Sequence, residues 1–103
     1  MMRRGELWVA EVGRKRRPVL VLTRSEVLDV RNLVTVAEIS TSIRGLTSEV
    51  PIEHGELGLD RPSVVNCDGL HTVAQASLTG RLGQVGDDVM RRVCWAISYA
   101  LGC

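Results

Sequence analysis

The spacing of the hydrophobic residues changes once along this chain, close to residue 86, and this change limits what the chain can fold into. From Asp87 onward the hydrophobic residues recur with the period of one face of an α-helix. They are Val89, Met90, Val93, Ile97, Ala100 and Leu101. Asp87 and Asp88 suit the first turn of a helix and Gly102 suits its end. We therefore predict one C-terminal amphipathic helix of about four turns.

Before residue 86 the chain carries short hydrophobic runs of strand length, separated by turn residues. Residues 18–23 form a nearly continuous run, which is typical of a strand buried on both faces. Pro51 places the run at 48–53 on a sheet edge or at a bulge, and the Asp68-Gly69 dipeptide predicts a turn. The predicted strands are 6–11, 18–23, 33–39, 48–53, 63–67, 70–74 and 81–85, with a basic turn at 13–17.

Together these elements predict one mainly β (α+β) domain over residues 1–103. It would be a small, strongly curved β-barrel or sheet of about five to seven strands with the helix packed on it. A hydrophobic content of 45% and a charged content of 24% exclude an intrinsically disordered chain. No hydrophobic run approaches the ~20 residues that span a membrane, and Arg3 and Arg4 do not begin a signal peptide. We therefore expect a cytoplasmic protein that does not associate with membranes.

Charge is unevenly distributed, although the net charge is only +1. Residues 1–31 hold eight basic and four acidic residues, a local charge of +4. Residues 32–70 hold two basic and six acidic residues, a local charge of −4. The first third of the chain, residues 1–31, is therefore either an anion-binding surface or a solvated basic loop.

The sequence carries no pattern that indicates a metal or a cofactor. Cys67, Cys94 and Cys103 form no CxxC pair, which disfavours a zinc ribbon. We expect Cys67 and Cys94 to be small buried hydrophobic residues and Cys103 to be a terminal thiol. The P-loop, GxGxxG, HExxH and GxSxG motifs are absent.

Polar side chains gather at the predicted strand ends and turns, which can converge on one face of a small barrel. A guanidinium, hydroxyls, a carboxylate and an imidazole suffice for metal-free cleavage of RNA. That reaction needs a base for the 2′-OH, an acid for the 5′-oxygen and donors to the phosphorane. Polar residues are equally expected at ordinary turns. The residues concerned are Arg17, Ser40, Thr41, Ser42, Asn66, Asp68 and His71.

Four segments, in their order and spacing, carry a resemblance to a known family. They are 4–8 (Arg-Gly-Glu-Leu-Trp), 17–22 (Arg-Pro-Val-Leu-Val-Leu), 63–72 (Ser-Val-Val-Asn-Cys-Asp-Gly-Leu-His-Thr) and 80–83 (Gly-Arg-Leu-Gly). In them the chain resembles the MazF/PemK-type (Kid-like) toxins of toxin–antitoxin pairs over nearly its whole length. The resemblance implies a small SH3-like β-barrel with a C-terminal helix, assembled as a homodimer.

It also implies a toxin of a type II system that acts as a metal-independent, sequence-specific endoribonuclease. Such enzymes cut single-stranded RNA and leave 2′,3′-cyclic phosphate and 5′-OH ends. The implied inhibitor is a cognate antitoxin whose flexible acidic tail folds into the RNA groove. Two alternatives stay open: a non-catalytic toxin of the wider barrel superfamily that acts on a protein such as gyrase, and a binding module that has lost activity.

The resemblance assigns catalytic roles residue by residue. Arg17 would bind the scissile phosphate, which suits its permanently charged guanidinium. Either Ser40 or Thr41 would replace the family's catalytic threonine. Asp68 matches the general base of one branch, although the arginine two residues earlier in that branch is Asn66 here. His71 stands where an arginine is common, and we expect it to take part in acid–base chemistry or phosphate contact, or to be a structural strand histidine.

The remaining expectations concern contacts. Gly69 stands where a glutamine is common in the family. We expect Glu6 and Trp8 to be structural. Trp95 and Tyr99 lie off the main hydrophobic stripe of the helix, which favours a dimer or antitoxin contact. The residues expected to contact RNA are Arg14, Lys15, Arg16, Arg44 and Asn66.

Overall fold

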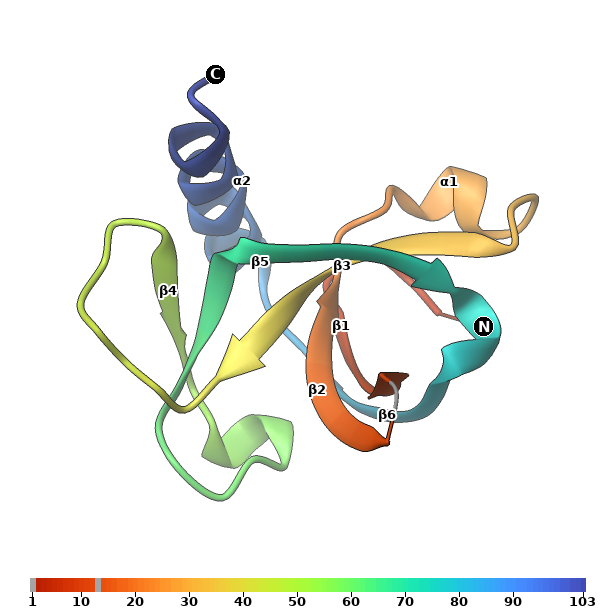
Figure 1. The fold of residues 1–103 in the computed structure, drawn as a ribbon, viewed down its shortest axis with the longest axis horizontal. Coiled ribbons are helices and arrows are strands. Elements are labelled where there is room, and N and C mark those ends of the chain that lie inside the picture. Colours follow the sequence, from red (N-terminus) through yellow and green to blue (C-terminus); the bar gives the residue numbers. More distant parts are fainter. Residues whose placement is uncertain (1, 13) are drawn as a thin grey trace.

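One antiparallel sheet, in the order β4-β5-β3-β2-β1-β6, organises the computed structural model, which describes residues 2–12 and 14–103. Its strands are β1 (Glu6–Val12), β2 (Lys15–Val21), β3 (Leu33–Ser40), β4 (Glu49–Ile52), β5 (Ser63–Ala74) and β6 (Leu78–Gln84). Figure 1 shows the sheet curling strongly on itself, although β4 and β6 remain as edges. The predicted mainly β fold with a barrel-like sheet is confirmed, and so is the edge position of the strand that contains Pro51.

The sheet buries hydrophobic side chains on both of its faces. Val19 and Val21 point into one core cluster, whereas Leu20 and Leu22 point into the other. This alternation follows from the two-residue period of a strand. It confirms the prediction that the run at 18–23 is buried on both sides.

The C-terminal helix α2 (Asp87–Leu101) packs on β5 and β4 and covers the cluster that contains Leu20. Val93 and Ala96 are its buried residues, and Leu101 is exposed at the end of the helix. Gly102 ends the helix with a φ of 76°, a left-handed conformation that glycine adopts at little cost. The helix prediction is therefore confirmed at both ends.

The prediction of a turn at Asp68-Gly69 is wrong. β5 continues through this dipeptide and turns a corner, as Figure 1 shows. Leu70 lies opposite Ala37 of β3, while Asn66 lies opposite Glu38, so residues 67–69 have no partner on β3. Extra residues in one strand bend it without ending it.

The predicted basic turn at 13–17 is too long, because β2 already begins at Lys15, and Gly13 lies outside the described residues. Three short helical segments were not predicted: α1 (Ser25–Leu28), η1 (Gly55–Leu57) and η2 (Gln75–Ser77). Within residues 2–12 and 14–103, no helix is both long enough and apolar enough to cross a bilayer.

The cysteines differ in environment. Cys67 is buried, as predicted, and burial raises the pKa of its thiol to about 11, with the nearby Asp68 carboxylate adding to the shift. Cys94 is exposed, so the prediction that it is buried is wrong. The reason is its position on α2, next to buried Val93 but on the outer side of the helix.

A buried carboxylate ties the first strand to the last. Glu6 Oε2 accepts a hydrogen bond from Arg81 Nε at 2.7 Å, and Oε1 accepts from Trp8 Nε1 at 3.1 Å and from the Arg3 backbone N–H at 2.6 Å. Burial acts to raise the pKa of Glu6, but these hydrogen bonds outweigh it and hold the pKa below its usual value. Glu6 and Trp8 are thus placed as structural residues.

We expect Glu6→Gln to lower the free energy of unfolding at pH 7 by roughly 1–3 kcal/mol, because charged hydrogen bonds are lost. A lowered folded-state pKa means that the carboxylate stabilises the fold above its unfolded pKa and that this contribution is lost as the pH falls through the folded pKa. Urea unfolding should therefore show the largest difference at pH 7 and a shrinking one in acid. Glu26→Gln, on the exposed side of α1, is the control. A loss that does not vary with pH would contradict the role of the charge.

Candidate functional site

Arg17 lies between two hollows, one lined by residues of each core cluster. It sits on β2 on the same face as Val19 and Val21, and its side chain is exposed. It lines both a cleft of about 680 Å³ and a smaller pocket of about 290 Å³. In the part of the chain that the structure describes, its guanidinium forms no ion pair. A permanent, uncompensated positive charge at this position suits an anionic ligand.

The larger cleft brings Arg17 together with the end of β3. The pairing of β2 with β3 ends at Val19 opposite Glu38, and Pro18, which precedes Val19, has no N–H to extend it. Ser40, at the end of β3, and Thr41 line the cleft beyond this point. The other lining residues are Pro18, Ile39, Ser42, Gly58, Leu59, Asp60, Ser63 and Leu82. The sequence-predicted group of one guanidinium and two hydroxyls therefore shares one cleft.

The two candidate hydroxyls differ in their local contacts. Ser40 Oγ accepts a hydrogen bond from the backbone N–H of Ser42 at 3.0 Å, which orders the start of the following loop. Thr41 is exposed next to it. Ser40 still has its own O–H to donate, because the observed bond uses it only as an acceptor. Both hydroxyls can therefore donate to an anion in the cleft.

The smaller pocket combines an apolar floor with charged walls. Hydrophobic side chains of four strands form the floor: Ala10, Val19, Val36 and Val73. Lys15, Arg17, Glu38 and His71 provide the polar lining. His71 Nε2 lies 3.5 Å from Glu38 Oε2, because Val36 faces His71 across the β3–β5 pairing and Glu38 follows two residues later on the same face. His71 and Arg17 thus line the same pocket, and the Glu38 carboxylate lies next to His71.

Glu38 is the residue that the sequence reasoning missed. Its only signal is a charged residue within the β-branched run at 33–39, on the same strand face as Val34 and Val36. Gly69 makes room for it: a Cβ atom on Gly69 would collide with the Glu38 carboxylate and would lie 3.1 Å from Asn66 Nδ2. The glycine at this position is therefore explained by space and not by an unusual backbone angle.

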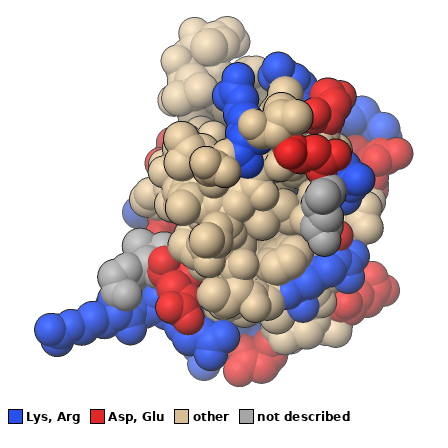
Figure 2. All heavy atoms as spheres, turned by 90° about the vertical axis from the view of Figure 1, so that its right-hand side faces the viewer, with Lys and Arg blue, Asp and Glu red and all other residues tan. Residues whose placement is uncertain are grey.

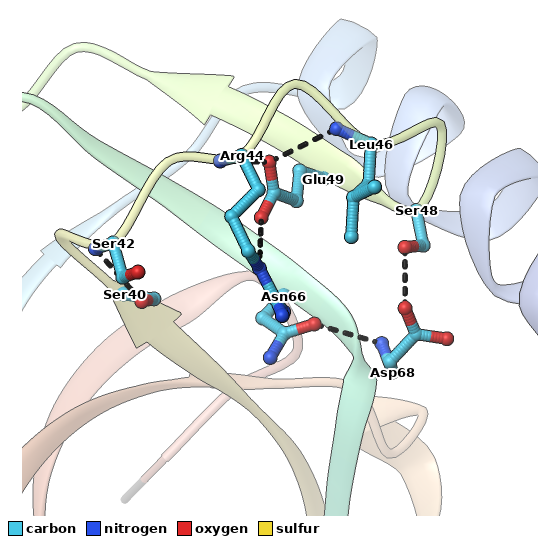
Figure 3. A network of polar contacts seen from close by, with 8 residues as sticks. All are labelled: Ser40, Ser42, Arg44, Leu46, Ser48, Glu49, Asn66 and Asp68. Atoms are coloured by element: carbon cyan, nitrogen blue, oxygen red, sulfur yellow. Dashed lines mark hydrogen bonds and ion pairs between the residues drawn. The ribbon is translucent and has the colours of Figure 1, made fainter.

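Asp68 and Asn66 do not line either hollow. Asp68, at the corner of β5, accepts a hydrogen bond from the Ser48 hydroxyl, and its backbone N–H donates to Asn66 Oδ1 at 3.0 Å. Figure 3 shows both residues beside the loop between β3 and β4. Within the described structure, the sequence-predicted general base is thus engaged in holding this loop to the β5 corner and is not brought to Arg17.

Arg44 belongs to the same loop network. Glu49, whose side chain is only 3% exposed, accepts hydrogen bonds from the backbone N–H groups of Arg44 at 3.0 Å and Leu46 at 3.2 Å. Its second oxygen lies 3.8 Å from Arg44 Nε (Figure 3). The positive charge of Arg44 is therefore partly compensated inside the chain.

The basic residues of the β1–β2 hairpin face different directions. Lys15 lies on the Arg17 face and lines the smaller pocket, whereas Arg16 lies on the other face, 3.9 Å from the Glu11 carboxylate. Arg14 is exposed at the turn. Figure 2, which views the right-hand side of Figure 1, shows basic and acidic side chains interspersed around an uncharged centre. The basic first third of the chain therefore forms no continuous positive surface on this face.

Trp95 and Tyr99 form an exposed aromatic pair on α2. Their side chains are 62% and 59% exposed, and their rings stack with centroids 5.9 Å apart. They lie off the buried stripe, as predicted. Among residues 2–12 and 14–103 there is no group of three His, Cys, Asp or Glu side chains arranged to hold a metal ion.

Comparison with known proteins shows the family and the fold of this chain. Residues 3–101 match the family described as "PemK-like, MazF-like toxin of type II toxin-antitoxin system". The chain is 43% identical to "Probable endoribonuclease MazF5" of Mycobacterium tuberculosis, covering 97% of this chain and 93% of that protein. It is 35% identical to "Probable endoribonuclease MazF2" of the same organism, covering 99% and 100%. The solved structure "Mycobacterium tuberculosis toxin MazF-mt6" is 37% identical, with a TM-score of 0.88, covering 94% of this chain and 96% of that one.

Proposed function

This chain belongs to the family of PemK-like, MazF-like toxins of type II toxin–antitoxin systems, and we propose that it cuts RNA at Arg17. It is the toxin of such a pair and an endoribonuclease, in line with the printed names of the relatives that match almost its whole length. The single observation that supports the proposed site is the position of Arg17. Its guanidinium, which forms no ion pair within the described residues, stands where a cleft with two hydroxyls meets a pocket with an imidazole–carboxylate pair.

In this proposal the scissile phosphate lies against Arg17. The 2′-OH of the preceding ribose gives up its proton to a base as its oxygen attacks the phosphorus. The bond to the 5′-oxygen breaks as that oxygen takes up a proton from an acid, which leaves a 2′,3′-cyclic phosphate and a 5′-OH. Negative charge builds up on the phosphorane oxygens, where the guanidinium and a hydroxyl of Ser40 or Thr41 donate hydrogen bonds. Such preorganised donors act without a metal ion, so we propose that none is required.

His71 is the proposed proton-transfer group. It lines the same pocket as Arg17 and can exchange a proton near neutral pH, which an arginine cannot. The Glu38 carboxylate faces the ring from β3, with Oε2 3.5 Å from Nε2. Asp68 is not part of this proposed machinery, since its carboxylate is bonded to Ser48 at the β5 corner.

The proposed partners follow from the same surface. Single-stranded RNA would pass through the cleft, with Arg14 as a further phosphate contact and Lys15 beside it at the smaller pocket. The acidic tail of a cognate antitoxin would compete for it. Toxin, RNA and antitoxin would meet in the cytoplasm. The chain acts as one domain over residues 1–103. The alternative of a non-catalytic toxin that binds a protein such as gyrase is not favoured, because the full-length relatives are named endoribonucleases.

Arg17→Ala should lower the rate of cleavage of a long single-stranded RNA in EDTA by roughly 100-fold or more. The reason is that the guanidinium no longer stabilises the negative charge that builds up on the phosphorane. The measurement is sequencing of the RNA ends, which should be cyclic phosphate and 5′-OH in the wild type. Arg16→Ala is the matched control, since Arg16 points away and pairs with Glu11. Equal losses in both variants would argue against a specific role for Arg17.

His71→Gln should slow cleavage by roughly 100-fold or more, because glutamine keeps hydrogen-bonding atoms but cannot transfer a proton. It should also change the dependence of the cleavage rate on pH, because the group that transfers the proton is gone. The other histidine offers a control in His54→Gln. A full cleavage rate in His71→Gln would rule out acid–base catalysis by this residue.

We also propose that the exposed pair of Trp95 and Tyr99 contacts a second copy of the chain or the antitoxin. Replacing both with serine should reduce the mass measured by sedimentation or weaken antitoxin binding, because exposed stacked aromatics supply apolar contact area. RNA cleavage by the same double variant, as a folded monomer, shows whether the two substitutions have damaged the fold in general. Unchanged oligomer mass together with unchanged antitoxin affinity would remove this assignment.

A further inference from the structure

The smaller pocket contains features that phosphate cleavage alone does not require. Its floor is apolar, made by valine side chains of β2, β3 and β5, and its volume of about 290 Å³ is near the lower end for small-ligand sites. A phosphate needs donors and gains nothing from an apolar floor. A flat, partly apolar ring gains from both the floor and the polar edge. The pocket thus has a size and a lining that suit one nucleobase, next to the arginine proposed to bind the phosphate.

We propose that this pocket binds a guanine base next to the scissile phosphate and that Glu38 is the residue that selects it. The inference rests on the proposed endoribonuclease function and adds the base that the enzyme prefers. Glu38 and Lys15 line the pocket together, so it presents a carboxylate acceptor and an ammonium donor around one apolar floor.

The choice of guanine follows from its edge. Guanine carries two neighbouring donors, N1–H and the 2-amino group, and beside them the acceptor O6. A carboxylate has enough lone pairs to accept both donors while one oxygen also faces His71. Lys15 can donate to O6. Adenine and cytosine each place a ring acceptor against the carboxylate, and uracil places two carbonyl oxygens near it, so all three are disfavoured.

Gly69 leaves room for the Glu38 carboxylate and so gives a second way to test this assignment. The Glu38 carboxylate lies where any side chain at position 69 would stand, so even alanine there would displace it. The smallest residue is thus found where the carboxylate needs the space. This gives a second variant, Gly69→Ala, which moves the carboxylate and keeps its charge.

The test uses two random RNA pools. One pool is ordinary RNA, and the ends produced by cleavage are sequenced. The other pool carries 2′-fluoro groups in place of the attacking 2′-OH and so cannot be cleaved. Its members that bind the protein are selected and sequenced. We expect the wild type to enrich guanine at one position in both pools. Four RNAs that differ only at this base should then show a guanine preference of roughly 10- to 100-fold in affinity. Replacing the guanine with inosine, which lacks the 2-amino group, should remove part of the preference.

Glu38→Gln should reduce the guanine preference to less than about threefold and raise the relative binding of adenine, because an amide pairs with adenine. Gly69→Ala should also lower the preference, and Glu26→Gln should leave it unchanged. If Glu38 only positions His71, Glu38→Gln would slow cleavage of all four RNAs equally and would not change the preference for guanine. That result would overturn the inference.

The two failures can be told apart. Cleavage without guanine selection, or selection that survives in both Glu38→Gln and Gly69→Ala, would overturn the base assignment and leave the nuclease intact. Guanine selection in the 2′-fluoro pool without cleavage of ordinary RNA would overturn the nuclease and keep the base site.

Discussion

Burial of β2 on both faces is the constraint from which the rest of the site follows. Val19 and Val21 fill one core while Leu20 and Leu22 fill the other, so a shift of one residue would place every side chain in the wrong cluster. The register of β2 against β1 and β3 is therefore fixed by packing. Because Arg17 lies two residues before Val19 on the same strand, its guanidinium is held on one face without needing a hydrogen bond of its own.

The bend in β5 divides the polar residues into two groups. The loop between β3 and β4 is held by the buried carboxylate of Glu49 and, through Ser48, by Asp68 at the bend. Residues after it return along β3 and bring His71 to Glu38. The same extra residues that bend the strand thus place Asp68 outside the pocket and His71 inside it. For this reason Asp68 and His71, three positions apart in the sequence, have different contacts: Asp68 bonds to the loop and His71 lines the pocket.

Much of this arrangement was accessible from the sequence, because local rules decide it. The period of α2, the two-sided burial at 18–23 and the shared cleft of Arg17 with Ser40 all follow from periodicity and strand ends. The corner at Asp68-Gly69 was not accessible, since the dipeptide that favours a turn also suits a bulge, and only the pairing with β3 distinguishes them. Glu38 was missed for a similar reason, because its role depends on His71, which comes next to it only through the pairing of β3 with β5.

The pairing of β1 with both β2 and β6 has a consequence for how the protein is made. β2 follows β1 directly, but β6 begins only at Leu78, so β1 stays an open sheet edge while most of the chain is being synthesised. During that time Glu6 also lacks Arg81, and the core lacks Leu78. We expect the nascent chain to become a stable, folded protein only when nearly all of it has left the ribosome. An RNA-cutting protein that folds so late has little opportunity to attack the message from which it is being read.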